Sequence, residues 1–81
     1  MLTVYSASWC AHCRRLRDHL DRASIAYEVV DIEKDEQAAE YVKSVNGGNA
    51  TVPTVRFPDG SFMTNPTINE VRARLVRLAV G

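Results

Sequence analysis

The chemistry available to this sequence is concentrated in one short segment, Ser8–Cys13, which reads SWCAHC. It contains Cys10 and Cys13, the two cysteines of the chain. Residues three apart on a helix have Cβ atoms about 5–6 Å apart, so a small adjustment would let these thiols form a disulfide. Such a pair can bind a metal ion, link the chain to itself, or exchange electrons as thiol and disulfide.

The two cysteines lie where a predicted strand ends and a predicted helix begins. Unpaired backbone N–H groups and the positive end of the helix dipole meet at such a junction, and both favour a thiolate over a thiol. We therefore expect Cys10 to be an exposed nucleophile and Cys13, one turn later, to be a more buried resolving thiol. A protonated His12 near Cys10 would stabilise the thiolate further and make the disulfide more oxidising.

The alternative roles of the cysteines have less support in the sequence. A zinc site needs about four ligands, and only His12 and His19 could join the two thiols. Since His19 falls on another side of the helix, we expect no metal. A purely structural pair is also disfavoured, because Trp9 and His12 flank the cysteines at an exposed helix start. A non-enzymatic metal-binding module stays open as an alternative.

Length and charge limit the class of protein. The chain has 81 residues, which predicts one domain over residues 1–81. Ten basic and ten acidic side chains cancel, so nothing favours binding to nucleic acid or to a membrane. No signal peptide or membrane span is visible. We expect a monomer in the cytoplasm, where thiols are kept reduced and such a pair is more often catalytic or metal-binding than structural.

Seven segments of regular structure follow from the apolar patterns and turn residues. Strands are predicted at Leu2–Ser6, Ala26–Glu33, Thr54–Phe57 and Ser61–Thr64, the last two forming a hairpin around Pro58–Gly60. Helices are predicted from Trp9, from Asp35 to the Asn46-Gly47-Gly48 stop signal, and from the region of Asn65-Pro66-Thr67. In the last helix, Pro66 suits the first turn and Thr67 with Glu70 forms a capping-box pattern.

The order of these elements, β-α-β-α-β-β-α, defines the fold class. The first two strands should be parallel, because a helix connects them, and the hairpin should add two antiparallel strands. The expected result is an α/β protein with a four-stranded mixed sheet flanked by three helices. This outline resembles the thioredoxin fold in its shortest form.

Three segments, in order and spacing, carry a more specific resemblance: SWCAHC, SVNGGNATVPTV and DGSFMTNP. Together they resemble the mycoredoxins, actinobacterial glutaredoxin-like proteins that work with mycothiol. The resemblance implies a glutaredoxin-type fold, a nucleophilic Cys10, a resolving Cys13 and a cis bond before Pro53. It also implies a thiol-disulfide oxidoreductase that reduces mixed disulfides between mycothiol and proteins. No cofactor would be bound, and electrons would come from mycothiol, mycothione reductase and NADPH.

The residues expected to bind the substrate or the thiol surround the cysteines in this resemblance. They are Trp9, His12, Thr51, Val52, Pro53, Thr64 and Asn65. Residues 47–54 and 61–69 contain no Lys, Arg, Asp or Glu, which suits the hydroxyl-rich mycothiol better than the charged glutathione. His12 replaces the Tyr that this family usually carries, and a His there is more typical of oxidising disulfide exchangers. The alternative function is a general dithiol reductase of disulfide-bonded proteins.

Overall fold

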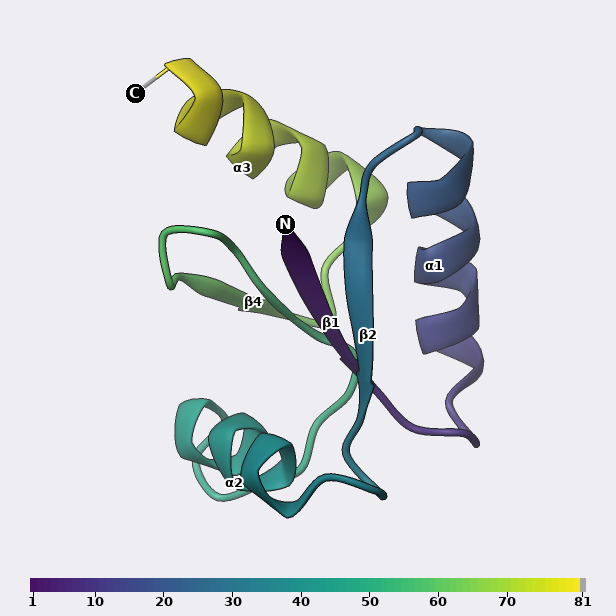
Figure 1. The fold of residues 1–81 in the computed structure, drawn as a ribbon, viewed down its shortest axis with the longest axis vertical. Helices are drawn as coiled ribbons and strands as arrows, with labels where there is room; N and C mark the ends of the chain where they lie inside the picture. Colours follow the sequence, from purple (N-terminus) through teal and green to yellow (C-terminus); the bar gives the residue numbers. More distant parts are fainter. Residues whose placement is uncertain (81) are drawn as a thin grey trace.

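The computed structural model describes residues 1–80 and contains the seven expected elements in the expected order (Figure 1). The strands are β1 (Leu2–Ser6), β2 (Tyr27–Asp31), β3 (Thr54–Arg56) and β4 (Phe62–Thr64). The helices are α1 (Ala11–Arg22), α2 (Glu36–Val45) and α3 (Ile68–Val80). The expected domain, residues 1–81, thus extends by Gly81 beyond the described residues.

The four strands form one mixed sheet in the order β2-β1-β3-β4. Strand β1 pairs in parallel with β2 and antiparallel with β3, while β3 and β4 form the hairpin. Both predicted pairing directions are confirmed. The pairing of Tyr5 with Thr54 places the beginning of β3 beside the end of β1, so the segment before β3 reaches the cysteine-containing junction.

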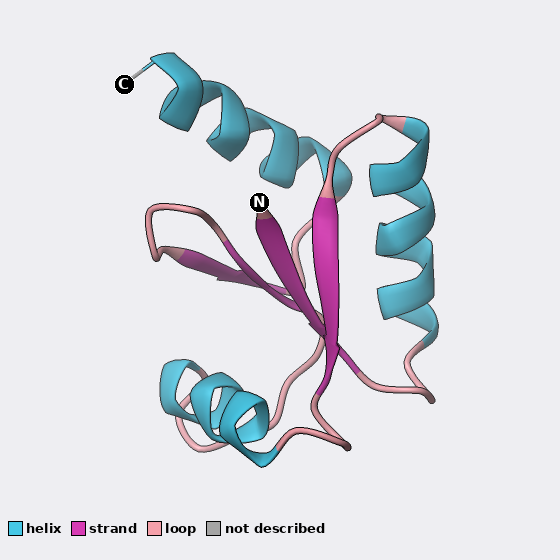
Figure 2. Ribbon diagram, in the orientation of Figure 1, coloured by secondary structure: helices cyan, strands magenta, loops and turns pink. Residues whose placement is uncertain are grey.

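The two faces of the sheet bury different helices, as the alternation along β1 requires. Leu2 and Val4 face a core shared with Leu16 and Leu20 of α1 and Val71 of α3. Tyr5 points to the opposite face, where Ala38 and Val42 of α2 cover it. Figure 2 shows the strands between these helices, with α2 apart from α1 and α3. The predicted sheet flanked by three helices is therefore confirmed.

The helix ends follow the predicted capping chemistry with one exception. The Asp35 side chain accepts a hydrogen bond from the Ala38 N–H at 3.1 Å, so it caps α2. Thr67 and Glu70 form the capping box at α3, with reciprocal bonds of 2.9 and 3.2 Å. The prediction that Pro66 lies in the first turn of α3 is wrong: Thr67 caps the helix, and the buried Pro66 precedes it.

Four predicted elements are longer than the observed ones, and the two hairpin strands differ by one residue each, since β3 ends at Arg56 and β4 begins at Phe62. Helix α1 begins at Ala11 rather than Trp9 because Cys10 occupies the capping position in an extended backbone conformation. Strand β2 covers Tyr27–Asp31, which matches the length of β1, the strand with which it pairs. Within residues 1–80, no helix combines the length and apolar character needed to cross a membrane.

The packing of α1 against the sheet makes Leu20 a strong test of this core. Its side chain is fully buried, so Leu20→Ala should lower the free energy of unfolding by about 2–5 kcal/mol through lost burial and a residual cavity. Urea denaturation followed by circular dichroism measures the change. The matched control is Val76→Ala on the exposed side of α3, which should change stability by no more than about 0.5 kcal/mol. Equal losses in both variants would contradict this packing.

Candidate active site

The sulfur of Cys10 caps the first helix. The backbone of Cys10 is extended, and its Sγ accepts a hydrogen bond from the backbone N–H of Cys13 at 3.2 Å. This N–H is one of the groups that a helix start leaves without an internal partner. Because the positive end of the helix dipole lies at the same place, the arrangement stabilises negative charge on this sulfur. The geometry therefore suits Cys10 to act as a thiolate nucleophile.

The expectation that Cys10 is exposed is wrong. Only 6% of its surface is accessible, while Cys13 is completely buried. The two cysteines form a small cluster with Ala7, and Val52 packs against it. The sulfur is covered because it turns back over the helix start to reach the Cys13 N–H. A substrate can therefore reach Cys10 over only a small part of its surface.

Burial separates the two thiols chemically. The pKa of Cys13 is raised to about 11, chiefly by loss of hydration and then by its hydrogen bond to Cys10. Hydrogen bonds with the Ser6 side chain and the Ala7 backbone act in the opposite direction but do not compensate. Cys13 thus stays protonated at neutral pH, which fits the role of a second, resolving thiol. Sequence reasoning missed the buried Ser6, since a serine at a strand end carries no distinctive signal.

Residues Thr51–Pro53, before β3, lie opposite Cys10 and are called the cis-proline wall below. The Val52–Pro53 peptide bond is cis, as the family resemblance predicted. The Cys10 thiol donates to the Val52 carbonyl oxygen at 3.8 Å, so the backbone of this segment faces the sulfur. Pro53 is buried, whereas Thr51 and Val52 are half-buried. The structure therefore brings these three predicted residues together with the cysteine pair.

The loop before α3 adjoins the same wall. The backbone N–H of Asn65 donates to the Pro53 carbonyl at 2.7 Å, and Asn65 adopts a left-handed conformation with φ of 55°. Thr64, at the end of β4, is exposed and donates its hydroxyl proton to Asn46. Both predicted residues are thus connected to the cis-proline segment.

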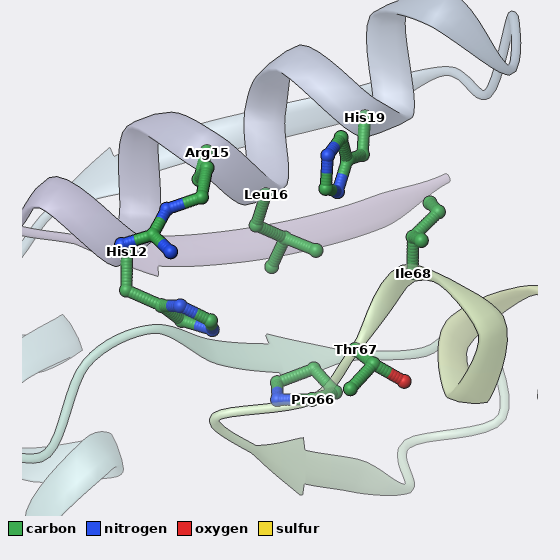
Figure 3. Close-up of a pocket in the computed structure, with 7 residues that line it drawn as sticks. All are labelled: His12, Arg15, Leu16, His19, Pro66, Thr67 and Ile68. Atoms are coloured by element: carbon green, nitrogen blue, oxygen red, sulfur yellow. The ribbon is translucent and has the colours of Figure 1, made fainter.

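Trp9 and His12, on either side of Cys10, differ in their exposure to solvent. Trp9 is 69% exposed directly before Cys10, where it is available to a substrate. His12 is half-buried and lines a pocket of about 180 Å³ together with Arg15, Leu16, His19, Pro66, Thr67 and Ile68. Figure 3 shows its imidazole directed toward Pro66. Across residues 1–80, no hydrogen bond joins His12 to either cysteine. The expected stabilisation of the thiolate by His12 is therefore not supported by a direct contact.

The histidines do not complete a metal site with the cysteines. His19 is exposed and lines the pocket on α1. In the part of the chain that the structure describes, no three His, Cys, Asp or Glu side chains lie close enough to hold a metal ion.

Two polar contacts near the site escaped the sequence analysis. Glu33, after β2, accepts hydrogen bonds from the backbone N–H and the hydroxyl of Ser8 at 3.0 and 2.8 Å, and so fixes the loop that leads to Cys10. Asn46 links α2 to β3 and β4. The sequence indicated only that Asn46 ends a helix, because contacts between distant segments leave no local pattern.

Comparisons with known proteins agree with this geometry. The sequence profile of the glutaredoxin family matches residues 2–63. A candidate glutaredoxin of Mycobacterium tuberculosis is 58% identical, over 96% of this chain and 93% of its own length. Mycoredoxin 1 of Corynebacterium glutamicum is 47% identical, over 96% of both chains. The match with Mycoredoxin 1 therefore spans nearly all of both proteins.

Solved structures show the same fold. A thioredoxin-like protein superposes with a TM-score of 0.76 at 25% identity, over 90% of this chain and 97% of the other. A glutaredoxin from Archaeoglobus fulgidus gives 0.71 at 27% identity, over 89% of this chain and 82% of the other. The sheet and helices that position the two thiols are thus shared with thioredoxin-like and glutaredoxin structures.

The unequal environments of the thiols predict unequal alkylation by iodoacetamide. At about pH 8, only Cys10 should react readily, because a thiol with a pKa of about 11 is ionised to roughly one part in a thousand. The rate at Cys13 should rise about tenfold per pH unit until about pH 11. Peptide mapping by mass spectrometry measures both sites. Faster modification of Cys13 than of Cys10 at about pH 8 would contradict the assignment.

Proposed function

Because this chain belongs to the glutaredoxin family and is a thiol-disulfide oxidoreductase, we propose that it reduces mixed disulfides between mycothiol and proteins. The observation that carries the proposal is the Cys10 sulfur, which caps α1 and lies beside the Val52 carbonyl. One sulfur is thereby activated as a nucleophile next to a backbone segment that can receive a substrate. The similarity to Mycoredoxin 1 supports the choice of thiol.

The first step is attack by the Cys10 thiolate on the mycothiol sulfur of the mixed disulfide. A new disulfide bond forms between Cys10 and mycothiol, the original sulfur–sulfur bond breaks, and the protein substrate leaves as a thiolate that takes a proton from water. The N–H of Cys13, which binds the Cys10 sulfur at 3.2 Å, lowers the cost of holding its charge before the attack. The substrate cysteine is reduced and Cys10 is oxidised.

The second step returns Cys10 to its reduced state. A second mycothiol, as its thiolate, attacks the mycothiol sulfur bound to Cys10, which yields the mycothiol disulfide and releases the Cys10 thiolate. Mycothione reductase and NADPH would then regenerate mycothiol. Thiol exchange of this kind needs no cofactor on the protein, and we place the reaction in the reducing cytoplasm with a monomeric protein.

The choice of mycothiol over glutathione follows from the neutral polar groups around the site. Thr51, Thr64 and Asn65 lie on or next to the cis-proline wall, and residues 47–54 and 61–69 carry no charged side chain. Glutathione presents two carboxylates and an ammonium group, which fixed charges would recognise, whereas mycothiol presents sugar hydroxyls. Thr67 is already committed to capping α3, so the argument rests on the missing charges rather than on this hydroxyl.

A second candidate function is the reduction of protein disulfides by both cysteines. The position of Cys13 favours it, since this residue is part of the same buried cluster as Cys10. In that reaction, Cys13 attacks the Cys10 sulfur of the mixed disulfide and displaces the substrate. The two cysteines then form an internal disulfide that a low-molecular-weight thiol must reduce.

Single cysteine variants distinguish these routes. Cys10→Ser should lose all exchange activity, because a hydroxyl is not ionised near neutral pH and forms no mixed disulfide. Cys13→Ser should keep activity toward mycothiol mixed disulfides, since mycothiol in solution can complete the cycle. Turnover of a mycothiol–peptide mixed disulfide, followed through NADPH consumption with mycothione reductase, measures both. If the two variants were equally inactive, the dithiol route would replace the proposed one.

The preference for mycothiol is tested with one peptide that carries either thiol as a mixed disulfide. At equal concentrations of substrate and matching thiol, reduction of the mycothiol form should be at least about tenfold faster, a difference of roughly 1.4 kcal/mol in the transition state. Stopped-flow kinetics with liquid chromatography of the released peptide measures the rates. Equal rates, or faster reduction of the glutathione form, would leave a general glutaredoxin-like reductase.

A further inference from the structure

The side chain of Asn46 connects three elements behind the cis-proline wall. Its amide Nδ2 donates to the Val42 carbonyl of α2 at 2.9 Å and to the Thr54 hydroxyl of β3 at 3.2 Å. Its Oδ1 accepts from the Thr64 hydroxyl of β4 at 2.5 Å. Both amide hydrogens and the carbonyl oxygen are therefore used, a combination of two donors and an acceptor that a carboxylate or an apolar side chain of this length lacks.

One of these contacts reaches the wall through Thr54. This residue is fully buried, and its hydroxyl donates to the Thr51 carbonyl at 2.8 Å. Because its single proton goes to Thr51, the hydroxyl can only accept from Asn46, so the two bonds fix each other's direction. The hydrogen bond thereby holds the Thr51 carbonyl, which belongs to the same peptide unit as the Val52 N–H.

The other contact reaches the wall through β4. Thr64 is followed by Asn65, whose backbone N–H donates to the Pro53 carbonyl at 2.7 Å. Asn46 thus holds the chain on both sides of Val52, at Thr51 through Thr54 and at Pro53 through β4. Between these two supports, the Val52 carbonyl lies 3.8 Å from the Cys10 sulfur.

From this arrangement we propose that Asn46 is a positioning residue for the protein substrate: it holds the Val52 backbone in place for pairing with the substrate segment that carries the disulfide. An extended segment can pair with exposed backbone groups as an added strand. The inference rests on the proposed function, since it assumes that Cys10 attacks a mixed disulfide that joins mycothiol to a polypeptide. Asn46 touches neither the sulfur nor the reacting disulfide, so its effect should depend on whether the substrate has a backbone to pair.

That dependence gives the experiment. Asn46→Ala is compared with the wild-type chain in three reactions of the reduced protein: with a mycothiol–peptide mixed disulfide, with bis(2-hydroxyethyl) disulfide, and with iodoacetamide. The rate constant for the peptide should fall about tenfold, the effect of roughly one lost hydrogen bond. The two small reagents should react within about twofold of the wild-type rate, because the Cys13 N–H that binds the Cys10 sulfur lies in α1, which Asn46 does not contact.

Ser44→Ala is the matched control. Ser44 lies near the same end of α2, but its hydroxyl donates only to Tyr41 within that helix, so all three rates should stay at the wild-type values. Thr54→Val is a second variant of similar shape that removes the links to Asn46 and Thr51, and it should reproduce the selective loss if Asn46→Ala does not fold. Equal losses with all reagents, or no loss with the peptide, would overturn the proposal.

A parallel series with a glutathione–peptide mixed disulfide separates this proposal from the choice of thiol. If the wild-type chain prefers the glutathione form, the mycothiol assignment fails, yet Asn46→Ala should still slow the peptide reaction selectively. If the wild-type chain reduces the mycothiol form as proposed but Asn46→Ala leaves the peptide rate unchanged, the positioning role alone fails. The two ideas therefore give different results in the same assay.

Discussion

The whole site depends on one hydrogen bond, from the backbone N–H of Cys13 to the sulfur of Cys10. A helix start normally receives a Ser, Thr, Asp or Asn side chain that satisfies such an N–H. Here a cysteine takes that position, so one hydrogen bond both stabilises the helix start and holds the reactive sulfur. Ionisation strengthens the bond, because a charged acceptor binds an N–H more strongly than a neutral one.

The order of the strands brings the other parts to this sulfur. Since β3 runs antiparallel to β1, the beginning of β3 lies at the end of β1, and the Val52–Pro53 bond must fall beside Cys10. Since β2 runs parallel to β1, the C-terminal ends of both strands lie side by side, where Glu33 accepts a hydrogen bond from Ser8. The site therefore combines residues from distant parts of the chain through two pairing directions of a single central strand.

The sequence alone predicted what depends on local pattern. The apolar stripe of α1, the Asp35 cap and the Thr67–Glu70 box each follow from residues within one or two helical turns, and the cysteine spacing indicated the chemistry. The burial of Cys10 and the role of Asn46 were not predictable in this way. They depend on Val52 packing against the thiols and on hydroxyls from two other strands, contacts that only the assembled sheet creates.

The same enclosure also controls when the second thiol can act. Three influences raise the pKa of Cys13: burial, its hydrogen bond to Cys10, and charge on Cys10. When Cys10 enters a mixed disulfide, its sulfur becomes neutral and a weaker acceptor, so the latter two influences decrease while burial remains. Cys13 thus becomes easier to ionise only after Cys10 has reacted, yet burial still opposes its ionisation. A thiol from solution is not buried, so it can compete with Cys13 in attacking the mixed disulfide at Cys10. The relative rates of the two attacks therefore depend on how strongly burial raises the pKa of Cys13.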